Sequence, residues 1–209
     1  MNSIRPILEA LEQAHGHFNA ALFGGRLRTS PVITVQTKGR KNALGWYWAK
    51  RWINGTSTPA ELNVSAEDLK RPADAVLETL VHEMVHQDAD ERGIKDTSRN
   101  GAYHNKRFRE LAAAAGLCVP AEPDKRHGFA FTTLGPEGSR ARVAVDGLVS
   151  KISPVLVLAR AIVPAKASKG KMLLFTCGCG FKIRCGRREL AAKCLSCDGR
   201  FKLQEGGGA

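Results

Sequence analysis

The stretch ETLVHEMVHQDADERG, residues 78–93, places two histidines four positions apart, with a glutamate beside the first. Residues i and i+4 of a helix lie on one face, about one turn apart, so His82 and His86 can converge on a single metal ion. Zinc accepts imidazole nitrogens at about 2.0–2.1 Å. Glu83 lies one position round the helix, where its carboxylate faces the open coordination position and can accept a proton from bound water. The pattern therefore predicts a hydrolytic zinc site.

The alternative is an ordinary helix that carries these polar residues on its flank. The neighbouring residues argue against it, because Val81, Met84 and Val85 alternate with the histidines in the most apolar helix of the chain. A neutral histidine on a half-buried face needs a partner, and a metal supplies one. We therefore favour metal binding.

A catalytic zinc site needs a third protein ligand and an open fourth position. The third ligand is expected downstream, within reach after a turn of the chain. His104, in NGAYHNKRF, is the favoured candidate, and Asp96 in the intervening loop is the alternative. Asp88 is poorly phased on the helix, Glu91 lies more than a turn further along it, and His127 is far away in the sequence.

Four cysteines near the end of the chain form two close pairs. One residue separates Cys177 from Cys179, fourteen residues follow, and two residues separate Cys194 from Cys197. Two close pairs joined by a short hairpin are what a zinc ribbon needs to bring four thiolates into a tetrahedron. A fragment this small has too little apolar mass to fold without the metal. The spacing predicts a structural zinc, with Cys185 as a fifth thiol that can displace one of the four.

The cysteine module is strongly basic. Between Lys166 and Lys202 there are ten Lys or Arg against two Asp or Glu, so +8 of the net charge of +12 lies in the last fifth of the chain. A basic block of this kind favours a polyanionic partner, above all nucleic acid, whereas the alternative is a charged surface that aids solubility. The expected phosphate contacts are Lys182, Arg184, Arg187, Arg188, Lys193 and Arg200.

Phe175, Phe181 and Phe201 are interleaved with these cations. Aromatic rings that stack on bases, beside cations that bind phosphates, suit single-stranded DNA. The other interpretation, which we favour for the phenylalanines themselves, is that they form the small core of the module. The DNA hypothesis therefore depends on the cations.

The composition is that of a globular protein, with 43% apolar and 25% charged residues among 209. No apolar run approaches the roughly 18 residues that span a bilayer, and MNSIRPILEALEQAHGHF lacks the apolar stretch of a secretory signal. We therefore expect a cytoplasmic protein that does not bind membranes and that associates with DNA through its basic module. Thiols stay reduced in the cytoplasm, so the cysteines are expected to be metal ligands rather than disulfides. Cys118 is expected to be a core thiol.

Hydrophobic spacing predicts the elements that must position these groups. The first five are a helix, three strands and a second helix, over residues 3–22, 32–36, 43–49, 60–65 and 72–92. His104 opens a third helix, which Gly116 closes. The order of helix, sheet, helix and helix fits an α+β domain.

Residues 43–49, ALGWYWA, are rich in aromatic side chains. On a strand, Trp46 and Trp48 share one face and Tyr47 lies on the other, and Trp52 follows shortly after. One face is expected to pack in the core, and the other to border the cleft of the site. This strand or the one at 60–65 can offer a sheet edge to which an extended substrate adds.

The pattern changes beyond Pro120. The segments HGFAFTTL, RARVAVDGLVS and VLVLARAIV are interpreted as strands or as a mixture of strand and helix. Residues 164–171, PAKASKGK, are predicted to be a flexible basic linker, and the Gly-rich residues 204–209 a disordered tail.

Taken together, these motifs resemble the SprT-like metalloprotease family, which includes the Spartan-type proteases that degrade proteins crosslinked to DNA. The resemblance is carried by FNAALFGGRL, ALGWYW, TLVHEMVHQ, RNGAYHNKRFRELAAAAGL and the paired cysteines. It implies a zincin-like catalytic domain over residues 1–119 and a zinc ribbon over residues 172–203. The extension and basic linker at 120–171 are not accounted for by it.

The resemblance also implies roles for single residues. A catalytic zinc is held by His82, His86 and His104, Glu83 is the general base and acid, and a structural zinc is held by the four paired cysteines. Tyr103 is a candidate donor to the developing oxyanion, or else a packed aromatic at a helix start.

The implied activity is that of a zinc endopeptidase acting on DNA-associated or DNA-crosslinked proteins. Two other classes stay open. One is a DNA-binding or regulatory protein that keeps the fold without protease activity, and the other is a zinc hydrolase of a non-protein amide. The complete set of catalytic residues favours the protease over the first.

Overall fold

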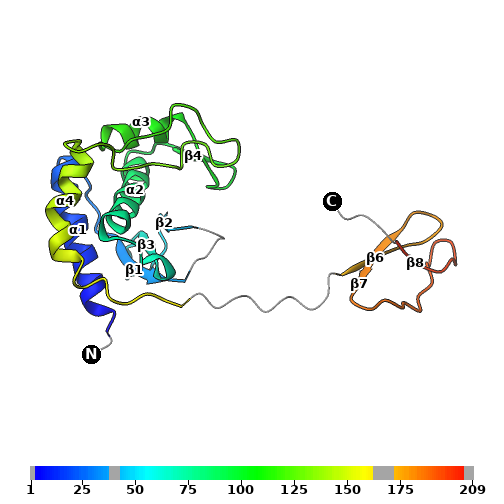
Figure 1. The fold of residues 1–209 in the computed structure, drawn as a ribbon. Coiled ribbons are helices and arrows are strands. Elements are labelled where there is room, and N and C mark those ends of the chain that lie inside the picture. Colours follow the sequence, from blue (N-terminus) through cyan, green and yellow to red (C-terminus); the bar gives the residue numbers. More distant parts are fainter. Residues whose placement is uncertain (1–2, 38–42, 162–171, 205–209) are drawn as a thin grey trace. The chain divides into compact units, whose positions relative to one another are not determined.

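The computed structural model describes residues 3–37, 43–161 and 172–204. The chain divides into two compact units, Met1–Ile162 and Val163–Ala209 (Figure 1). No helix in the described part of the chain combines the length and the apolar character that crossing a membrane requires.

The first unit is larger than the resemblance implies. It includes residues 120–161, which the resemblance leaves as an extension to a domain ending at 119. The basic linker predicted at 164–171 lies outside the described residues, and so do residues 205–209 of the predicted tail.

The first unit mixes helices and strands, which confirms the α+β class. In chain order its elements are α1 (Arg5–Phe23), β1 (Val32–Gln36), β2 (Gly45–Trp48), β3 (Glu61–Ser65), the short 3-10 helix η1 (Ala66–Asp68), α2 (Ala73–Glu91), β4 (Thr97–Ser98), β5 (Tyr103–His104), α3 (Lys106–Ala114) and α4 (Arg140–Ile152). The helices and strands predicted up to residue 92 are all present. The third helix begins at Lys106, so the prediction that His104 opens it is wrong.

The sheet of the first unit has the strand order β1-β3-β2. β3 runs parallel to β1, with Val32 opposite Glu61, and antiparallel to β2, with Tyr47 opposite Leu62. Every residue of β3 is buried, because the strand lies in the middle of the sheet and α2 packs against it. β2 has one neighbouring strand among the described residues, so its outer edge is not paired with a strand.

Helix α2 lies at the centre of the first unit, where it packs against α1, α3, α4, β2 and β3 (Figure 1). It begins after Pro72, whose ring suits a helix start, and Gly93, with φ +63°, follows its end. Because neighbours cover it on several sides, side chains on α2 are held in fixed positions. Its fully buried apolar residues are Val76, Leu77, Leu80, Val81, Met84, Val85 and Ala89.

Of the three segments interpreted as strands or as a mixture of strand and helix, RARVAVDGLVS forms a helix, α4, over residues 140–152. The buried side chains recur at helical spacing, at Ala141, Ala144, Val145 and Ile152, and they join the same hydrophobic core as α1 and α2. Burial of this face outweighs the β-branched character of the segment.

Arg140 fastens α4 to two other helices. Its Nη2 donates to the carbonyl of Leu22, in the last turn of α1, and to that of Ala114, at the end of α3, both at 2.6 Å. The last carbonyls of a helix have no partner within the helix, so one guanidinium satisfies groups at two helix ends.

The other two segments interpreted as strands form no strand among the described residues. Residues 127–134 make isolated bridges, between Gly128 and His104 and between Thr133 and Cys118. Residues 153–161 run without regular structure.

The second unit contains a small antiparallel sheet in the order β7-β6-β8, formed by β6 (Leu173–Thr176), β7 (Lys182–Cys185) and β8 (Lys202–Leu203). Phe175, Cys177 and Cys194 are the buried apolar residues among its described positions. A unit with so few buried side chains has little hydrophobic core to stabilise it.

Candidate metal centres

Three histidines converge within the first unit. His82 and His86 extend from the same face of α2, and His104 reaches them from β5. The Nε2 atom of His104 lies 3.2 Å from Nε2 of His82 and 3.1 Å from Nε2 of His86. The three residues predicted as ligands are therefore brought together as a group that could hold a metal ion.

The outer ring nitrogens of two of these imidazoles have side-chain partners. Nδ1 of His86 lies 2.6 Å from Oδ2 of Asp96, and Nδ1 of His82 lies 3.0 Å from Oγ1 of Thr132. The carboxylate can only accept, so Nδ1 of His86 carries a proton and, in the neutral ring, its Nε2 carries a lone pair. That lone pair faces the centre of the group.

Hydrogen bonds among the rings do not account for this convergence. A proton on Nε2 of His104 can be donated well to only one of its two neighbours, and Nδ1 of His104 is buried without a partner among the described atoms. Donor atoms at 2.0–2.1 Å from a tetrahedral zinc lie about 3.3 Å apart, close to the separations found here. The donor set and its spacing fit a zinc-type ion.

Phe108 forms the base of the histidine group. Its ring centroid lies 4.8, 4.9 and 4.5 Å from those of His82, His86 and His104, and the side chain is fully buried. The residue is held in place because Asn105 caps α3, with its side chain accepting from the amides of Arg107 and Phe108. This contact was missed at the sequence level, where Phe108 is one apolar residue of a helix.

Glu83 is buried beside the histidines. Burial raises the pKa of its carboxyl to about 7, against the lowering effect of His86 and of a hydrogen bond from the backbone amide of Tyr47. A pKa near neutrality is what a group needs to accept and return a proton at physiological pH. The position predicted for the general base is therefore chemically suited to that work.

Two of the three histidines are biased toward the neutral form that binds metals. Burial, with the charges of neighbouring histidines, lowers the pKa of His82 strongly and that of His104 to about 3. Burial also acts to lower the pKa of His86, but its hydrogen bond to Asp96 and the charges of Glu83 and Asp96 raise it overall. Asp96 thus makes His86 the most basic ring of the three.

The other residues weighed as third ligand have different partners. Asp96 contacts the outer nitrogen of His86, and Asp88 pairs with Arg26 at 2.7 Å and with Arg92 at 3.0 Å. Glu91 accepts hydrogen bonds from the backbone at residues 28 and 29. His127 is exposed and pairs with Asp124 at 3.0 Å.

The segment that follows Pro120 supports the site through the backbone of His104. The amide of Phe129 donates to the carbonyl of His104 at 3.0 Å, and the amide of His104 donates to the carbonyl of His127 at 2.9 Å. Gly128, with φ +67°, permits this approach, since a Cβ there would collide with the carbonyl oxygen of His104. Sequence reasoning assigned this segment no role.

Strand β2 lies beside Glu83. The hydroxyl of Tyr47 donates to Asp90 on α2 at 3.0 Å, so this side chain faces the helix. A Cβ on Gly45 would lie 2.9 Å from Thr79 and 3.1 Å from Glu83, so only glycine lets the strand approach the helix this closely.

The tryptophans of this region are not part of the hydrophobic core. Trp46 is half-buried and donates from Nε1 to Glu61 at 2.9 Å, whereas Trp48 and Trp52 are exposed. The guanidinium of Arg51 lies 4.2 Å from the Trp48 ring centroid. Tyr47 faces α2, as its bond to Asp90 shows, and it is half-buried like Trp46.

Tyr103 packs at the hairpin that carries the third histidine. The guanidinium of Arg99 lies 4.5 Å from its ring centroid, and its ring edge borders the position of Gly128. These contacts agree with the interpretation of a packed aromatic.

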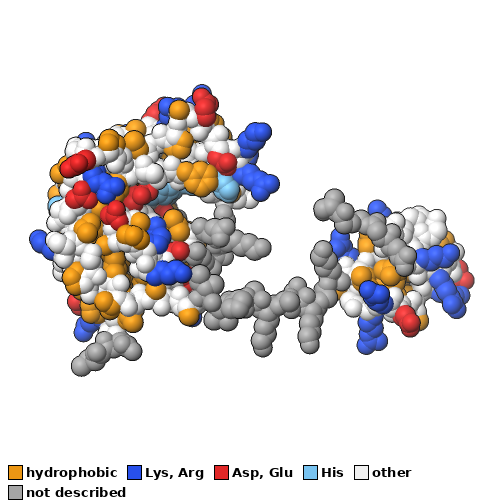
Figure 2. Space-filling model, viewed as in Figure 1, with side chains coloured by type: hydrophobic (Ala, Val, Ile, Leu, Met, Phe, Trp, Pro, Cys, Tyr) orange, Lys and Arg blue, Asp and Glu red, His pale blue; other side chains and the backbone are white. Residues whose placement is uncertain are grey.

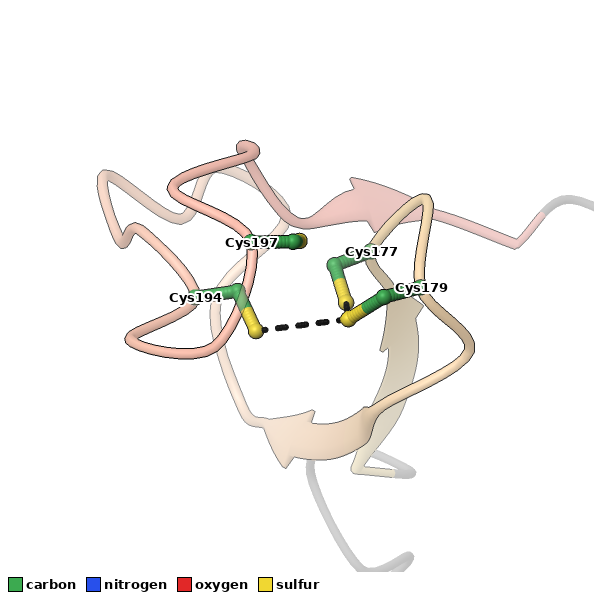
Figure 3. Close-up of side chains that lie close together, drawn as sticks. All are labelled: Cys177, Cys179, Cys194 and Cys197. Atoms are coloured by element: carbon green, nitrogen blue, oxygen red, sulfur yellow. Dashed lines mark hydrogen bonds between the residues drawn. The ribbon is translucent and has the colours of Figure 1, made fainter.

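A second group of possible ligands lies in the second unit (Figure 3). Cys177 and Cys179 come from the loop after β6, and Cys194 and Cys197 from the loop before β8. The sulfur atoms of Cys177 and Cys179 are 3.0 Å apart, and those of Cys179 and Cys194 are 3.6 Å apart. The predicted set of four is thus brought together, and four thiols in this arrangement fit a closed tetrahedral metal site.

Backbone amides favour the thiolate form of one of these cysteines. The amide of Ser196 lowers the pKa of Cys194 to about 7, and the amide of Cys197 acts in the same direction. A thiolate, rather than a thiol, is the form that binds a metal.

The remaining two cysteines lie elsewhere. Cys185, on β7, is not part of the group of four, and its sulfur accepts from the amide of Arg187 at 3.4 Å. Cys118 is exposed, so the prediction of a core thiol is wrong. Its neighbour Leu117 is buried, and the extended backbone that pairs with Thr133 turns the next side chain outward.

All six cations predicted to contact DNA are exposed. Figure 2 shows Lys and Arg side chains over much of the visible face of the second unit. Lys193 differs from the others because its Nζ lies 3.1 Å from a carboxylate oxygen of Asp198. Phe175 is buried in the small core, whereas Phe181 is 59% exposed. The core interpretation therefore holds for Phe175, and Phe181 is accessible to a ligand.

Comparison of the chain with protein-family models, with curated proteins and with solved structures finds no match.

Proposed function

We propose that the protein is a zinc endopeptidase of SprT-like type, with a zincin-like catalytic domain and a C-terminal zinc ribbon, and that it cleaves proteins bound or crosslinked to DNA. The observation that supports this most is the convergence of three imidazole Nε2 atoms beside the buried carboxylate of Glu83. This combination of ligands and base is what peptide hydrolysis at a metal requires.

His82, His86 and His104 would hold the catalytic zinc. When bound, a zinc ion supplies Lewis acidity, which lowers the pKa of water and polarises a carbonyl group. Glu83 takes a proton from the attacking water and passes it to the leaving amine.

Strand β2 offers a place for the substrate backbone. The amide of Tyr47 donates to Glu83, so the outer edge of β2 and the general base are adjacent. An extended peptide that pairs with this edge would bring its scissile bond toward the three histidines. This feature favours a peptide over a small non-protein amide, which has no strand to pair.

The second unit supports the DNA part of the proposal. The four cysteines would hold a structural zinc, and the exposed cations of this unit would contact phosphates, with Phe181 available for stacking. A protein that only bound DNA would have no use for a carboxylate buried at a histidine group, since burial of such a group is unfavourable. The enzyme is therefore preferred over a purely DNA-binding protein.

The test is Glu83→Gln in the full chain, assayed for cleavage of a DNA-bound protein with and without single-stranded DNA. We expect the cleavage rate to fall about 10²–10⁴-fold, because the general base is lost while its shape is kept. Zinc content, measured by metal analysis, should be unchanged.

The matched control is Glu110→Gln, which alters an exposed glutamate of α3 and should leave the rate unchanged. Cleavage by Glu83→Gln at the wild-type rate would contradict the proposal. A wild-type protein that binds zinc and DNA without cleaving any protein would favour the non-proteolytic alternative.

A further inference from the structure

The three candidate ligands differ in what holds their outer nitrogen. A carboxylate, that of Asp96, contacts His86, and a hydroxyl, that of Thr132, contacts His82. His104 has no such partner among the described atoms and is held through its backbone instead. The contact at His82 comes from fifty residues further along the chain.

Thr132 is well placed to act on His82 alone. Its side chain is buried, with 8% of the residue exposed, and its Oγ1 lies 3.0 Å from Nδ1 of His82. Because water has little access to this contact, loss of the hydroxyl would leave Nδ1 of His82 without a replacement partner. The neutral hydroxyl can accept from Nδ1–H without adding charge to the ring.

Thr132 lies within a fixed stretch of chain, residues 127–134, which we call the clasp. Near one end, the amide of Phe129 donates to the carbonyl of His104, and the Phe129 side chain is buried. At the other, Thr133 and Cys118 exchange backbone hydrogen bonds of 2.9 and 2.7 Å, and Leu134 is buried. Anchors on both sides of Thr132 hold its hydroxyl in place.

We propose that Thr132 is a positioning residue of the histidine site, which fixes the ring of His82 with the proton on Nδ1 and the lone pair of Nε2 aimed at the metal. The inference rests on metal binding by the three histidines, as in the proposed function. The clasp thus acts on two of the three ligands, because it fixes the backbone of His104 and the side chain of His82. Residues 120–161 are thereby part of the site rather than an appendage.

The test compares two neighbouring threonines in the full chain. Thr132→Val keeps the shape but removes the hydroxyl, and Thr132→Ser keeps the hydroxyl. Thr133→Val is the matched control, because Thr133 is exposed and its side chain makes no hydrogen bond among the described residues. Zinc affinity of the histidine site is measured by chelator competition. Cobalt substitution distinguishes the two sites, because only cobalt bound to the cysteines shows the charge-transfer bands of thiolates.

We expect Thr132→Val to weaken zinc binding at the histidine site by about 10–100-fold, the usual effect of removing a partner of a ligating histidine. Thr132→Ser should restore affinity to near the wild-type value, and Thr133→Val should not change it. Nitrogen-15 spectra of the wild-type rings should show His82 protonated at Nδ1.

Equal affinities for the two valine variants would overturn the inference and leave the proposed protease intact. A wild-type His82 protonated at Nε2 in the zinc-bound protein would overturn it too, whether or not the variants fold. Absence of zinc binding at the wild-type histidines would instead remove the metal site itself and, with it, both proposals.

Discussion

The two candidate metal sites are built in opposite ways. The four cysteines lie within twenty-one residues, on two loops of a small sheet whose buried apolar residues are Phe175 and two of the cysteines themselves. The histidines and their supporting groups come from α2, β5, α3 and the clasp, all anchored in a large core. Protein packing positions the histidines, whereas a metal held by the four cysteines would supply much of the fold of the second unit.

The strongest test of this contrast is removal of metal. Without zinc, or in Cys194→Ser, we expect the second unit to unfold, because structural zinc contributes on the order of 10 kcal/mol to such modules at neutral pH. The first unit should stay folded, since its core does not include the ligands. Backbone NMR spectra of the full chain with and without a chelator check this.

Loss of ordered signals from α1 and α2 together with those of β6 and β7 would show that the two units do not differ in this way. Cys185→Ser is the control for the cysteine substitution, because Cys185 is not part of the group of four. It should retain the spectrum of the zinc-bound second unit.

Substitution of Phe108 should have the next largest effect, and it tests whether packing positions the histidines. Phe108→Ala should destabilise the first unit by about 3–5 kcal/mol, as expected for a fully buried phenylalanine, and should also weaken zinc binding at the histidines. Phe108→Leu, which fills more of the space, should recover part of both. Denaturant unfolding measures the stability, and chelator competition measures the zinc affinity. If the free energy of unfolding falls while the zinc affinity stays at the wild-type value, packing by Phe108 does not position the histidines.

The smallest effect concerns the surface of the second unit. Replacing Lys182 and Arg184 with alanine should reduce the slope of log affinity for single-stranded DNA against log salt by about 1.4, or 0.7 for each lost phosphate contact. Lys193→Ala should change the slope less, because Asp198 already pairs with Lys193. Fluorescence anisotropy over a range of salt concentrations measures both, and equal slopes for all variants would place the DNA contacts elsewhere.

The sequence predicts those parts of the sites that depend on short spacing. His82 and His86 follow from helical periodicity, the paired cysteines from hairpin spacing, and His104 from the need for a third ligand. The helices and strands up to residue 92 could also be predicted from neighbouring residues. Each follows from a hydrophobic pattern and the turn residues that bound it.

What the sequence did not predict depends on contacts between distant residues. Nothing in the spacing of Phe108, Gly128 or Thr132 indicates that they meet the histidines, because the fold alone brings them there. The sequence left helix α4 open between strand and helix for a different reason. Its β-branched valines favour a strand, whereas Ala141, Ala144 and Val145 have the spacing of a helical face.

The position of Arg140 has a consequence for how the first unit opens. One guanidinium closes the last turns of α1 and α3, so release of either end disturbs the cap of the other. Fraying at these two helix ends is therefore coupled: their amide protons should exchange with solvent together, at a rate governed by the docking of α4.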